Sequence, residues 1–284
     1  MNLLNTIINW ANQRNIDCIE CNHPSYDCSG SCQDCLYEIH YWHRNPKLDR
    51  RKRYNCRALA YEYVISFTER YCENILFACE DIDLSCYDDI SILSLGCGIS
   101  PDLMAFEKIL NGDYFFYRGV DDNRYWNEFH DIIYEYSSNH FFDVDYLTQS
   151  AFVSSNAYNE IYNVIVMQFF ISSVLSEGGS YNDFQDLFDE LIDSILLRWY
   201  NSKLKSPFLF ILNDTDSVFT GRKQFFQLLE ALSNNGHKGN AFARSAHISD
   251  DMADRNNMDF RGFNLKAMTD ICNNSASLVI EVEK

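Results

Sequence analysis

The stretch of sequence that decides the fold is Ser91-Ile-Leu-Ser-Leu-Gly-Cys-Gly-Ile-Ser-Pro-Asp102. It starts with a short apolar run of the kind that forms a buried strand in a parallel sheet. Gly96 and Gly98 follow, and glycine permits backbone conformations and close approaches that a side chain would prevent. Ser100 and Pro101 are typical of the first residues of a helix. The sequence therefore predicts a strand, a glycine turn and a helix, a unit on which α/β proteins bind nucleotide-like ligands.

Strands and helices are expected to alternate on both sides of this unit. The other expected strands are 114–122, 140–146, 164–170 and 208–212, and the expected helices are 2–15, 56–79, 126–136, 181–199 and 223–232. This alternation predicts an α/β fold with a doubly wound, seven-stranded, mainly parallel sheet. Residues 233–259 are expected to form a long loop, and 262–268 and 276–283 a C-terminal antiparallel hairpin.

The charge of the chain is strongly acidic and unevenly distributed. The net charge is -18 over 284 residues; residues 1–60 carry eight Lys and Arg against six Asp and Glu, and the remainder carries 15 against 35. An acidic domain repels a phosphate backbone at long range, so nucleic acid is not the default partner. The sequence has neither an apolar run of membrane-spanning length nor the pattern of a signal peptide. We therefore expect a soluble, cytoplasmic protein without a membrane partner.

A second motif, near the N-terminus, consists of two Cys-x2-Cys pairs. Cys18 and Cys21 form the first pair, and Cys32 and Cys35 form the second, ten residues further on. This spacing is typical of structural zinc sites, because each pair can occupy one side of a tetrahedron. We expect residues 1–57 to form a small helical, Cys-rich module that binds zinc through these four thiolates. Residues 58–284 would form the main domain, with 58–86 as its leading helix.

The module leaves two questions open. Cys28, His40 or Cys56 could replace one of the four zinc ligands or contribute to a second site. A basic connector follows the Cys-rich segment, and its charged residues are Lys47, Arg50, Arg51, Lys52 and Arg53. The connector could contact RNA phosphates, or it could be a solvated segment or an intramolecular partner of the acidic domain.

From residue 87 onward the chain resembles the class I S-adenosylmethionine-dependent methyltransferases. The resemblance rests on Leu95-Gly96-Cys97-Gly98 after the first strand, on Gly119-Val120-Asp121 at the end of the second, and on the closing hairpin. It implies a Rossmann-like domain whose glycine turn passes under the methionine part of S-adenosylmethionine (SAM). In that family an acidic residue after the second strand binds the ribose hydroxyls, and a residue after the third meets the adenine amine.

The resemblance implies a cofactor site when it is carried over to this sequence. The residues assigned to that site are Ser94, Gly96, Cys97, Gly98, Asp121, Asp122, Asp145, Tyr146 and Gln168. Asp121 would accept from the ribose hydroxyls, with Asp122 as its neighbour. Asp145, in preference to Asp143, would accept from the adenine amine, and Tyr146 would pack on the ring. Gln168 ends the fourth strand, where the family places the transferred methyl group and its acceptor; no catalytic residue is assigned.

Three positions of the opening stretch separate the alternative functions. Ser94 replaces a usually acidic residue of the family, and Ser100 replaces a frequent third glycine. Pro101 stands where the dinucleotide-binding fingerprint needs a glycine, which ranks an NAD-dependent oxidoreductase well behind a methyltransferase. Ser94 and the lack of an acceptor motif leave open a non-catalytic, zinc-stapled interaction scaffold. The basic connector leaves open an RNA methyltransferase.

Overall fold

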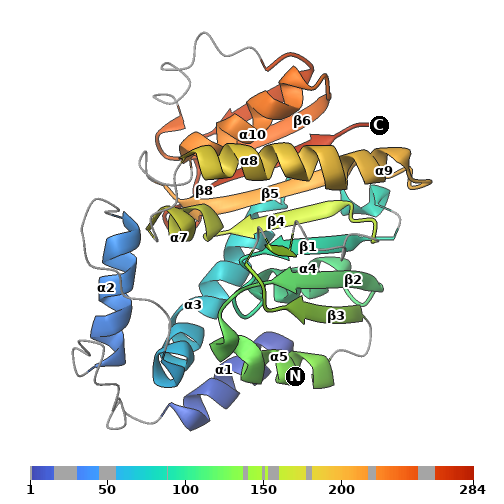
Figure 1. Cartoon of the computed structure of the whole chain (residues 1–284). Coiled ribbons are helices and arrows are strands. Elements are labelled where there is room, and N and C mark those ends of the chain that lie inside the picture. Colours follow the sequence, from blue (N-terminus) through green and yellow to red (C-terminus); the bar gives the residue numbers. More distant parts are fainter. Residues whose placement is uncertain are drawn as a thin grey trace.

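A mixed β-sheet lies at the centre of the protein (Figure 1). The structure is a computed structural model that describes residues 2–15, 31–44, 56–87, 89–136, 140–148, 151–152, 160–176, 181–216, 222–248 and 260–284. Its strands are β1 (Ser91–Leu95), β2 (Phe115–Val120), β3 (His140–Asp145), β4 (Val164–Gln168), β5 (Phe208–Thr215), β6 (Gly239–Arg244), β7 (Phe263–Met268) and β8 (Ser275–Val282). Their order is β3-β2-β1-β4-β5-β8-β6-β7. Only β8 runs antiparallel to its neighbours, β5 and β6.

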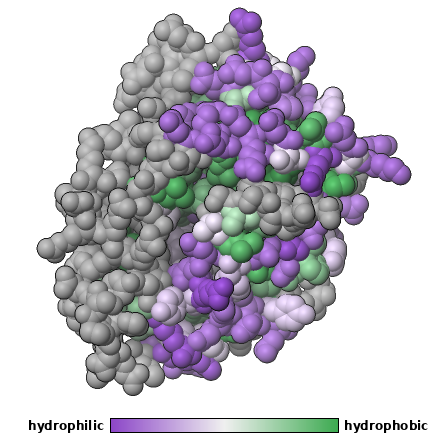
Figure 2. Space-filling view, in the orientation of Figure 1, coloured by the Kyte–Doolittle hydropathy of each residue, from purple (hydrophilic) through white to green (hydrophobic). Residues whose placement is uncertain are grey.

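Helices cover both faces of this sheet. One face carries α1 (Leu3–Arg14), α3 (Arg57–Ala78), α4 (Pro101–Leu110) and α5 (Asn127–Tyr136). The other carries α7 (Phe170–Ser176), α8 (Tyr181–Glu190), a π-helical segment (Leu191–Leu196), α9 (Leu197–Asn201) and α10 (Arg222–Asn234). Among the described connections, two contain short 3-10 helices, η2 (Leu84–Cys86) and η3 (Arg124–Trp126). Hydrophilic side chains dominate the outward surface over α8, as its amphipathic sequence predicts (Figure 2).

The apolar run of β1 is explained by burial on both faces. Leu93 and Leu95 pack into the core under α8 and α10, whereas Ile92 packs with α1 and α4 on the opposite face. A strand that is covered on both sides cannot alternate between apolar and polar residues, which is why it reads as a continuous hydrophobic run. The predicted strand, turn and helix therefore form as expected, and so does most of the alternation around them.

The C-terminal hairpin prediction is wrong in its pairing. β7 and β8 do not pair with each other: β8 inserts between β5 and β6, and β7 runs parallel to β6 at the edge. The burial of the two strands explains this arrangement. Seven of the eight residues of β8 are buried, so it needs a neighbour on each side, whereas no residue of β7 is fully buried. The sheet consequently has eight strands instead of the seven expected.

The expectation of a long loop at 233–259 is also wrong, because β6 lies inside it. Small and polar residues make up most of β6, so its sequence lacks the β-branched pattern typical of strands. Gly239 starts the strand where a Cβ atom would lie 1.8 Å from the Glu281 carbonyl oxygen, so only glycine fits this approach. The fourth strand ends earlier than expected, at Gln168, because α7 begins at Phe170.

The N-terminal region adds two helices to the main domain. α1 contributes Leu3, Leu4 and Ile7 to the same core as β1 and α4. α2 (Cys32–Arg44) packs Leu36 and Ile39 against Leu59 of α3. The predicted boundary between a module at 1–57 and a domain at 58–284 stays a prediction. Residues 47–53, with the basic side chains assigned to RNA contact, lie outside the described residues.

Candidate functional site

The candidate site lies at the carboxyl edge of the sheet, between β1 and β4. These strands are neighbours, but β1 continues through α4 to β2 on one side, whereas β4 continues to β5 on the other. Where the strand order reverses in this way, the two connections diverge and leave a crevice for ligands. α7, which follows β4, marks this edge in Figure 1, and α2 stands on the same side.

The glycine turn is fixed against β2 and has room above it. The N–H groups of Gly96 and Cys97 both donate to the Val120 carbonyl, at 2.8 and 3.2 Å. Gly96 has φ +67°, and a Cβ atom there would lie 2.9 Å from the ring of Phe170. Gly98 has φ +53°, but a Cβ atom there would meet nothing within 4 Å. The turn therefore needs glycine at both positions for its conformation, and the space beside Gly98 can admit a ligand.

Asp121 meets the glycine turn directly. Its Oδ2 accepts from the Gly98 N–H at 2.8 Å, and its Oδ1 accepts from the Asn123 N–H at 2.9 Å. Burial raises the pKa of this carboxyl group to about 6. Each carboxylate oxygen can accept more than one hydrogen bond, so the group can also accept from a ligand hydroxyl. Its neighbour Asp122 is exposed to solvent.

A buried histidine joins the turn to the end of β3. His130 lies on the apolar face of α5, with Nε2 2.8 Å from the Gly98 carbonyl oxygen and Nδ1 2.6 Å from the Tyr146 hydroxyl. Burial lowers the pKa of its imidazole to about 4. The sequence analysis did not select His130. Its helical position among apolar residues gave no signal, because its partners come from segments that are 16 and 32 residues away.

Asp145 is held by an arginine that the sequence analysis also missed. Arg118 on β2 donates from Nη1 to Asp145 Oδ2 at 2.8 Å and makes two further hydrogen bonds of 3.0 Å to Glu160. The same Nη1 lies 3.1 Å from a carboxylate oxygen of Asp143. One oxygen of Asp145 is thus engaged in an ion pair. The contact expected between Asp145 and an adenine amine stays a prediction, as does the packing of Tyr146 on the ring.

A buried carboxylate lies beneath the glycine turn, beside Ser94. The Oδ1 atom of Asp102, in the first turn of α4, accepts from the Tyr117 hydroxyl at 2.9 Å, and its buried Oδ2 atom has no hydrogen-bond partner among the described residues. Burial raises the pKa of Asp102 to about 6. Position 94 has no acidic side chain, but Asp102 of α4 places a carboxyl group beside it.

Two side chains of the opening stretch have roles in packing and strain. A Cβ atom at Gly119 would lie only 2.7 Å from the Cys97 Sγ atom, so the Cys97 side chain fills the space that this glycine leaves on β2. Burial raises the pKa of the Cys97 thiol well above its usual value, which disfavours a nucleophilic thiolate. Ser100, at the position of the family's third glycine, has φ +63° and a buried hydroxyl without a hydrogen-bond partner among the described residues.

The end of β4 brings polar and aromatic side chains to the same edge. Gln168 donates from Nε2 to the Tyr71 carbonyl at 2.7 Å, and its register partner on β5 is Asn213. Both amide atoms of Asn213 are buried and have no partner within the described ranges. Phe169 has φ +51°, a conformation that is strained for an aromatic residue, and its ring centroid lies 4.3 Å from that of Tyr71. Strain of this kind clusters at functional sites.

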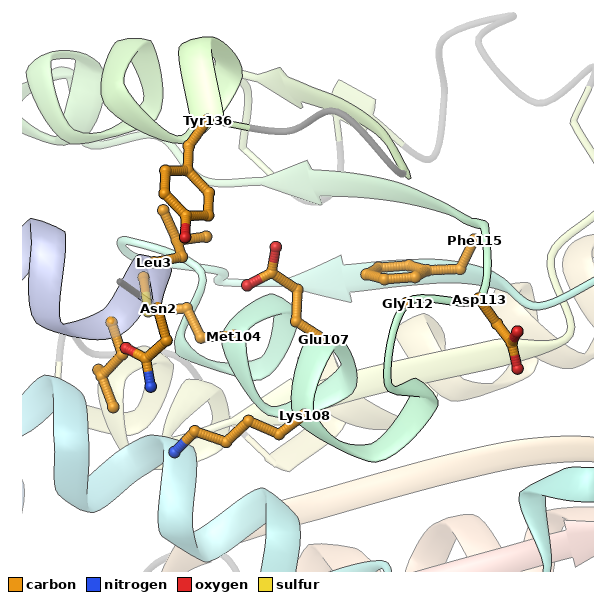
Figure 3. A pocket seen from close by; sticks show the side chains of 10 residues that line it. Asn2, Leu3, Met104, Glu107, Lys108, Gly112, Asp113, Phe115 and Tyr136 are labelled. Carbon is orange, nitrogen blue, oxygen red and sulfur yellow. The ribbon is translucent and has the colours of Figure 1, made fainter.

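A cavity of about 240 Å³ lies at the opposite edge of the sheet, near the start of β2. Its lining residues are Asn2, Leu3, Leu4, Met104, Glu107, Lys108, Gly112, Asp113, Phe115 and Tyr136. The Glu107 carboxylate points into it, between the side chains of Tyr136 and Phe115 (Figure 3). Burial raises the pKa of Glu107 to about 7. The cavity is separate from the glycine turn, and the sequence analysis did not predict it.

The zinc prediction falls largely outside the described residues. Cys32 and Cys35 lie three residues apart in α2 and are half-buried, whereas Cys18 and Cys21 are not among the described residues. Within the described ranges, no three His, Cys, Asp or Glu side chains are grouped so that they could hold a metal ion. The zinc site stays a prediction. No helix in the described part of the chain is long and apolar enough to cross a membrane.

Comparison with known proteins returned methyltransferases among solved structures. No protein-family model and no curated protein sequence matches the chain. The plantazolicin methyltransferase BpumL in complex with S-adenosylhomocysteine (SAH) is 13% identical, with 89% of this chain and 99% of that chain covered and a TM-score of 0.45. The METTL16 methyltransferase domain is 12% identical over 89% and 96%, with a TM-score of 0.45. Magnesium protoporphyrin IX methyltransferase (ChlM) from Synechocystis PCC 6803, with bound SAM, is 8% identical over 88% and 97%, with a TM-score of 0.41.

Proposed function

We propose that this protein is a SAM-dependent methyltransferase. The observation that carries the proposal is the 2.8 Å hydrogen bond from the Gly98 N–H to Asp121 at the point where the strand order reverses. This hydrogen bond connects the glycine turn to Asp121, which lies 23 residues further along the chain. A carboxylate at the end of the second strand is the kind of group that binds ribose hydroxyls in nucleotide-binding α/β folds. The resemblance to class I methyltransferases rested in part on a closing antiparallel hairpin; β8 is antiparallel, but it pairs with β5 and β6 and not with β7, so this feature supports the proposal only in strand direction.

The residues at the turn fit a nucleoside ligand. The open space beside the Gly98 α-carbon lets a ligand pack closely against the backbone, which a side chain at this position would prevent. Asp121 can accept from two ribose hydroxyls while it keeps its bonds to the Gly98 and Asn123 N–H groups. The carboxylate oxygen of Asp145 that Arg118 does not contact would accept from the adenine amine, with Tyr146 beside it. The Asp102 carboxylate adds negative charge beneath the turn, which favours a positively charged methionine group.

In this reaction the protein mainly has to align the nucleophile with the methyl group. SAM supplies a methyl group bound to a sulfonium, a leaving group that needs no protonation. A nucleophile at the ends of β4 and β5 would form its bond to the methyl carbon as the carbon–sulfur bond breaks, and would lose its own proton to solvent. Gln168 and the rings of Tyr71 and Phe169, which contact one another at the end of β4, would orient that nucleophile and exclude water.

Equilibrium titration with SAH tests the proposal. The wild-type protein should bind one SAH, and Asp121→Ala should lose the binding because it removes the acceptor of the ribose hydroxyls. Asp193→Ala, an exposed carboxylate in the π-helical segment on the other face, is the matched control and should bind as the wild type does. Absence of SAH binding to the wild type at millimolar concentration would contradict a methyltransferase and favour an interaction scaffold.

A further inference from the structure

We propose that His130 is a positioning residue that holds the glycine turn and Tyr146 in the arrangement that binds the nucleoside. Its ring lies between Gly98 on one side and Tyr146 on the other, at 2.8 and 2.6 Å. Only 4% of the His130 surface is exposed, so the two contacts are shielded from water. The inference rests on the proposed function, because the turn and Tyr146 are assigned there to the cofactor.

The partners of His130 determine which nitrogen carries the proton. A carbonyl oxygen can only accept, so Nε2 must carry the hydrogen that is donated to the Gly98 carbonyl. In a neutral imidazole the other nitrogen is then an acceptor, so Nδ1 accepts from the Tyr146 hydroxyl. The pKa of about 4 means that the neutral form prevails at neutral pH. One tautomer therefore satisfies both contacts.

The two contacts of His130 hold the backbone of Gly98 and the side chain of Tyr146 in place. The Gly98 N–H is held by Asp121 and the Gly98 carbonyl by His130, so the residue at the centre of the turn is fixed from both sides. Glycine with φ +53° has little intrinsic preference for this conformation, so these two hydrogen bonds select it. The phenol hydrogen of Tyr146 is directed at His130, which turns the oxygen lone pairs of the phenol outward.

Packing alone does not account for a histidine at this position. The ring lies 5.8 Å from Phe142 and 5.7 Å from Tyr146 between centroids, and a phenylalanine could make such aromatic contacts. An imidazole also brings two polar nitrogens into a buried place, which costs free energy unless both are hydrogen bonded. Both are bonded here, and their partners belong to the two segments that the proposed cofactor would touch.

Variants at position 130 separate positioning from packing. His130→Phe keeps the ring but removes both hydrogen bonds, and we expect it to weaken SAH binding about ten-fold, the effect of about one lost buried hydrogen bond. His130→Gln offers an amide donor and an amide acceptor, and it should restore most of the affinity. His237→Phe is the matched control, because His237 is half-buried in the turn before β6 and should not affect SAH binding.

The tautomer provides a test that does not depend on ligand binding. Nitrogen NMR of histidine-labelled wild-type protein should show His130 as the neutral Nε2–H form from pH 6 to 8. If His130→Phe does not fold, Tyr146→Phe removes the same contact from the other side and should weaken SAH binding several-fold. A charged or Nδ1–H ring, or wild-type affinity in both His130→Phe and Tyr146→Phe, would overturn the inference. If the wild-type protein does not bind SAH, that result would overturn the proposed function instead.

Discussion

Replacement of Ser100 by glycine is expected to stabilise this protein. Ser100 precedes α4 with φ 63° and ψ 52°, in the left-handed region that L-residues enter at a cost. It is fully buried, and its hydroxyl has no hydrogen-bond partner in the described part of the chain. Glycine has no side chain to strain in this conformation, and it would also remove the unpartnered hydroxyl.

The magnitude follows from three contributions. Relief of the left-handed conformation is worth about 1 kcal/mol, and removal of a buried, unsatisfied hydroxyl about 1 kcal/mol more. The greater conformational freedom of glycine in the unfolded chain opposes these gains by about 1 kcal/mol. The free energy of unfolding should therefore rise by about 1 kcal/mol, which corresponds to an increase in Tm of about 2 °C for a domain of this size.

Urea denaturation at pH 7 measures this change, and Asn111→Gly is its control. Asn111 ends α4 with φ 47° and ψ 41°, so it has the same backbone conformation as Ser100. It is exposed, and asparagine tolerates this region better than serine does, so the gain should be about 0.5 kcal/mol or less. A Ser100→Gly protein that is less stable than the wild type would refute the strain argument. Equal gains for the two variants would refute the contribution of the buried hydroxyl.

Three further predictions concern other positions. SAH binding should weaken about ten-fold from pH 7 to pH 5, because the ribose hydroxyls need the ionised carboxylate of Asp121. The raised pKa of about 6 leaves only about a tenth of this carboxyl group ionised at pH 5. Equal affinities at the two pH values, measured by calorimetry, would contradict this. Gly119→Ala should lower the free energy of unfolding by about 2 kcal/mol through overlap with Cys97, and Cys97→Ala in the same chain should recover part of the loss in urea denaturation. Arg244→Met should cost about 2 kcal/mol, because the buried guanidinium pairs with two carboxylates and covers the Phe77 ring, and an unchanged Tm would show that these pairs contribute nothing.

The local sequence was sufficient to predict elements that are defined by their own pattern. The apolar run of β1, the glycines after it and the helix starting at Pro101 form within twelve residues, so no distant contact is needed to recognise them. β6 escaped prediction because the neighbouring β8 and the close approach at Gly239 stabilise it, not its own side chains. The order of β7 and β8 depends on which strand is buried on both sides, and this is a property of the whole sheet.

The same distinction applies to the site. Gly98 and Asp121 could be assigned together because one helix and one strand separate them, and parallel strands bring their carboxyl ends to the same edge. Arg118 and His130 were missed because each acts through partners on other elements, and nothing in their own sequence neighbourhood marks them. The carboxylate beside Ser94 was missed for a similar reason, since nothing in the sequence next to Asp102 shows that it packs beside Ser94 and Tyr117.

The crystal structure of the protein grown with millimolar SAH would test the central claim most directly. The account predicts an adenosine at the carboxyl edge between β1 and β4, with its ribose hydroxyls within hydrogen-bond distance of Asp121 and its chain passing over Gly98. An ordered structure in which SAH lies elsewhere, or in which this edge holds no ligand at saturating concentration, would contradict the account.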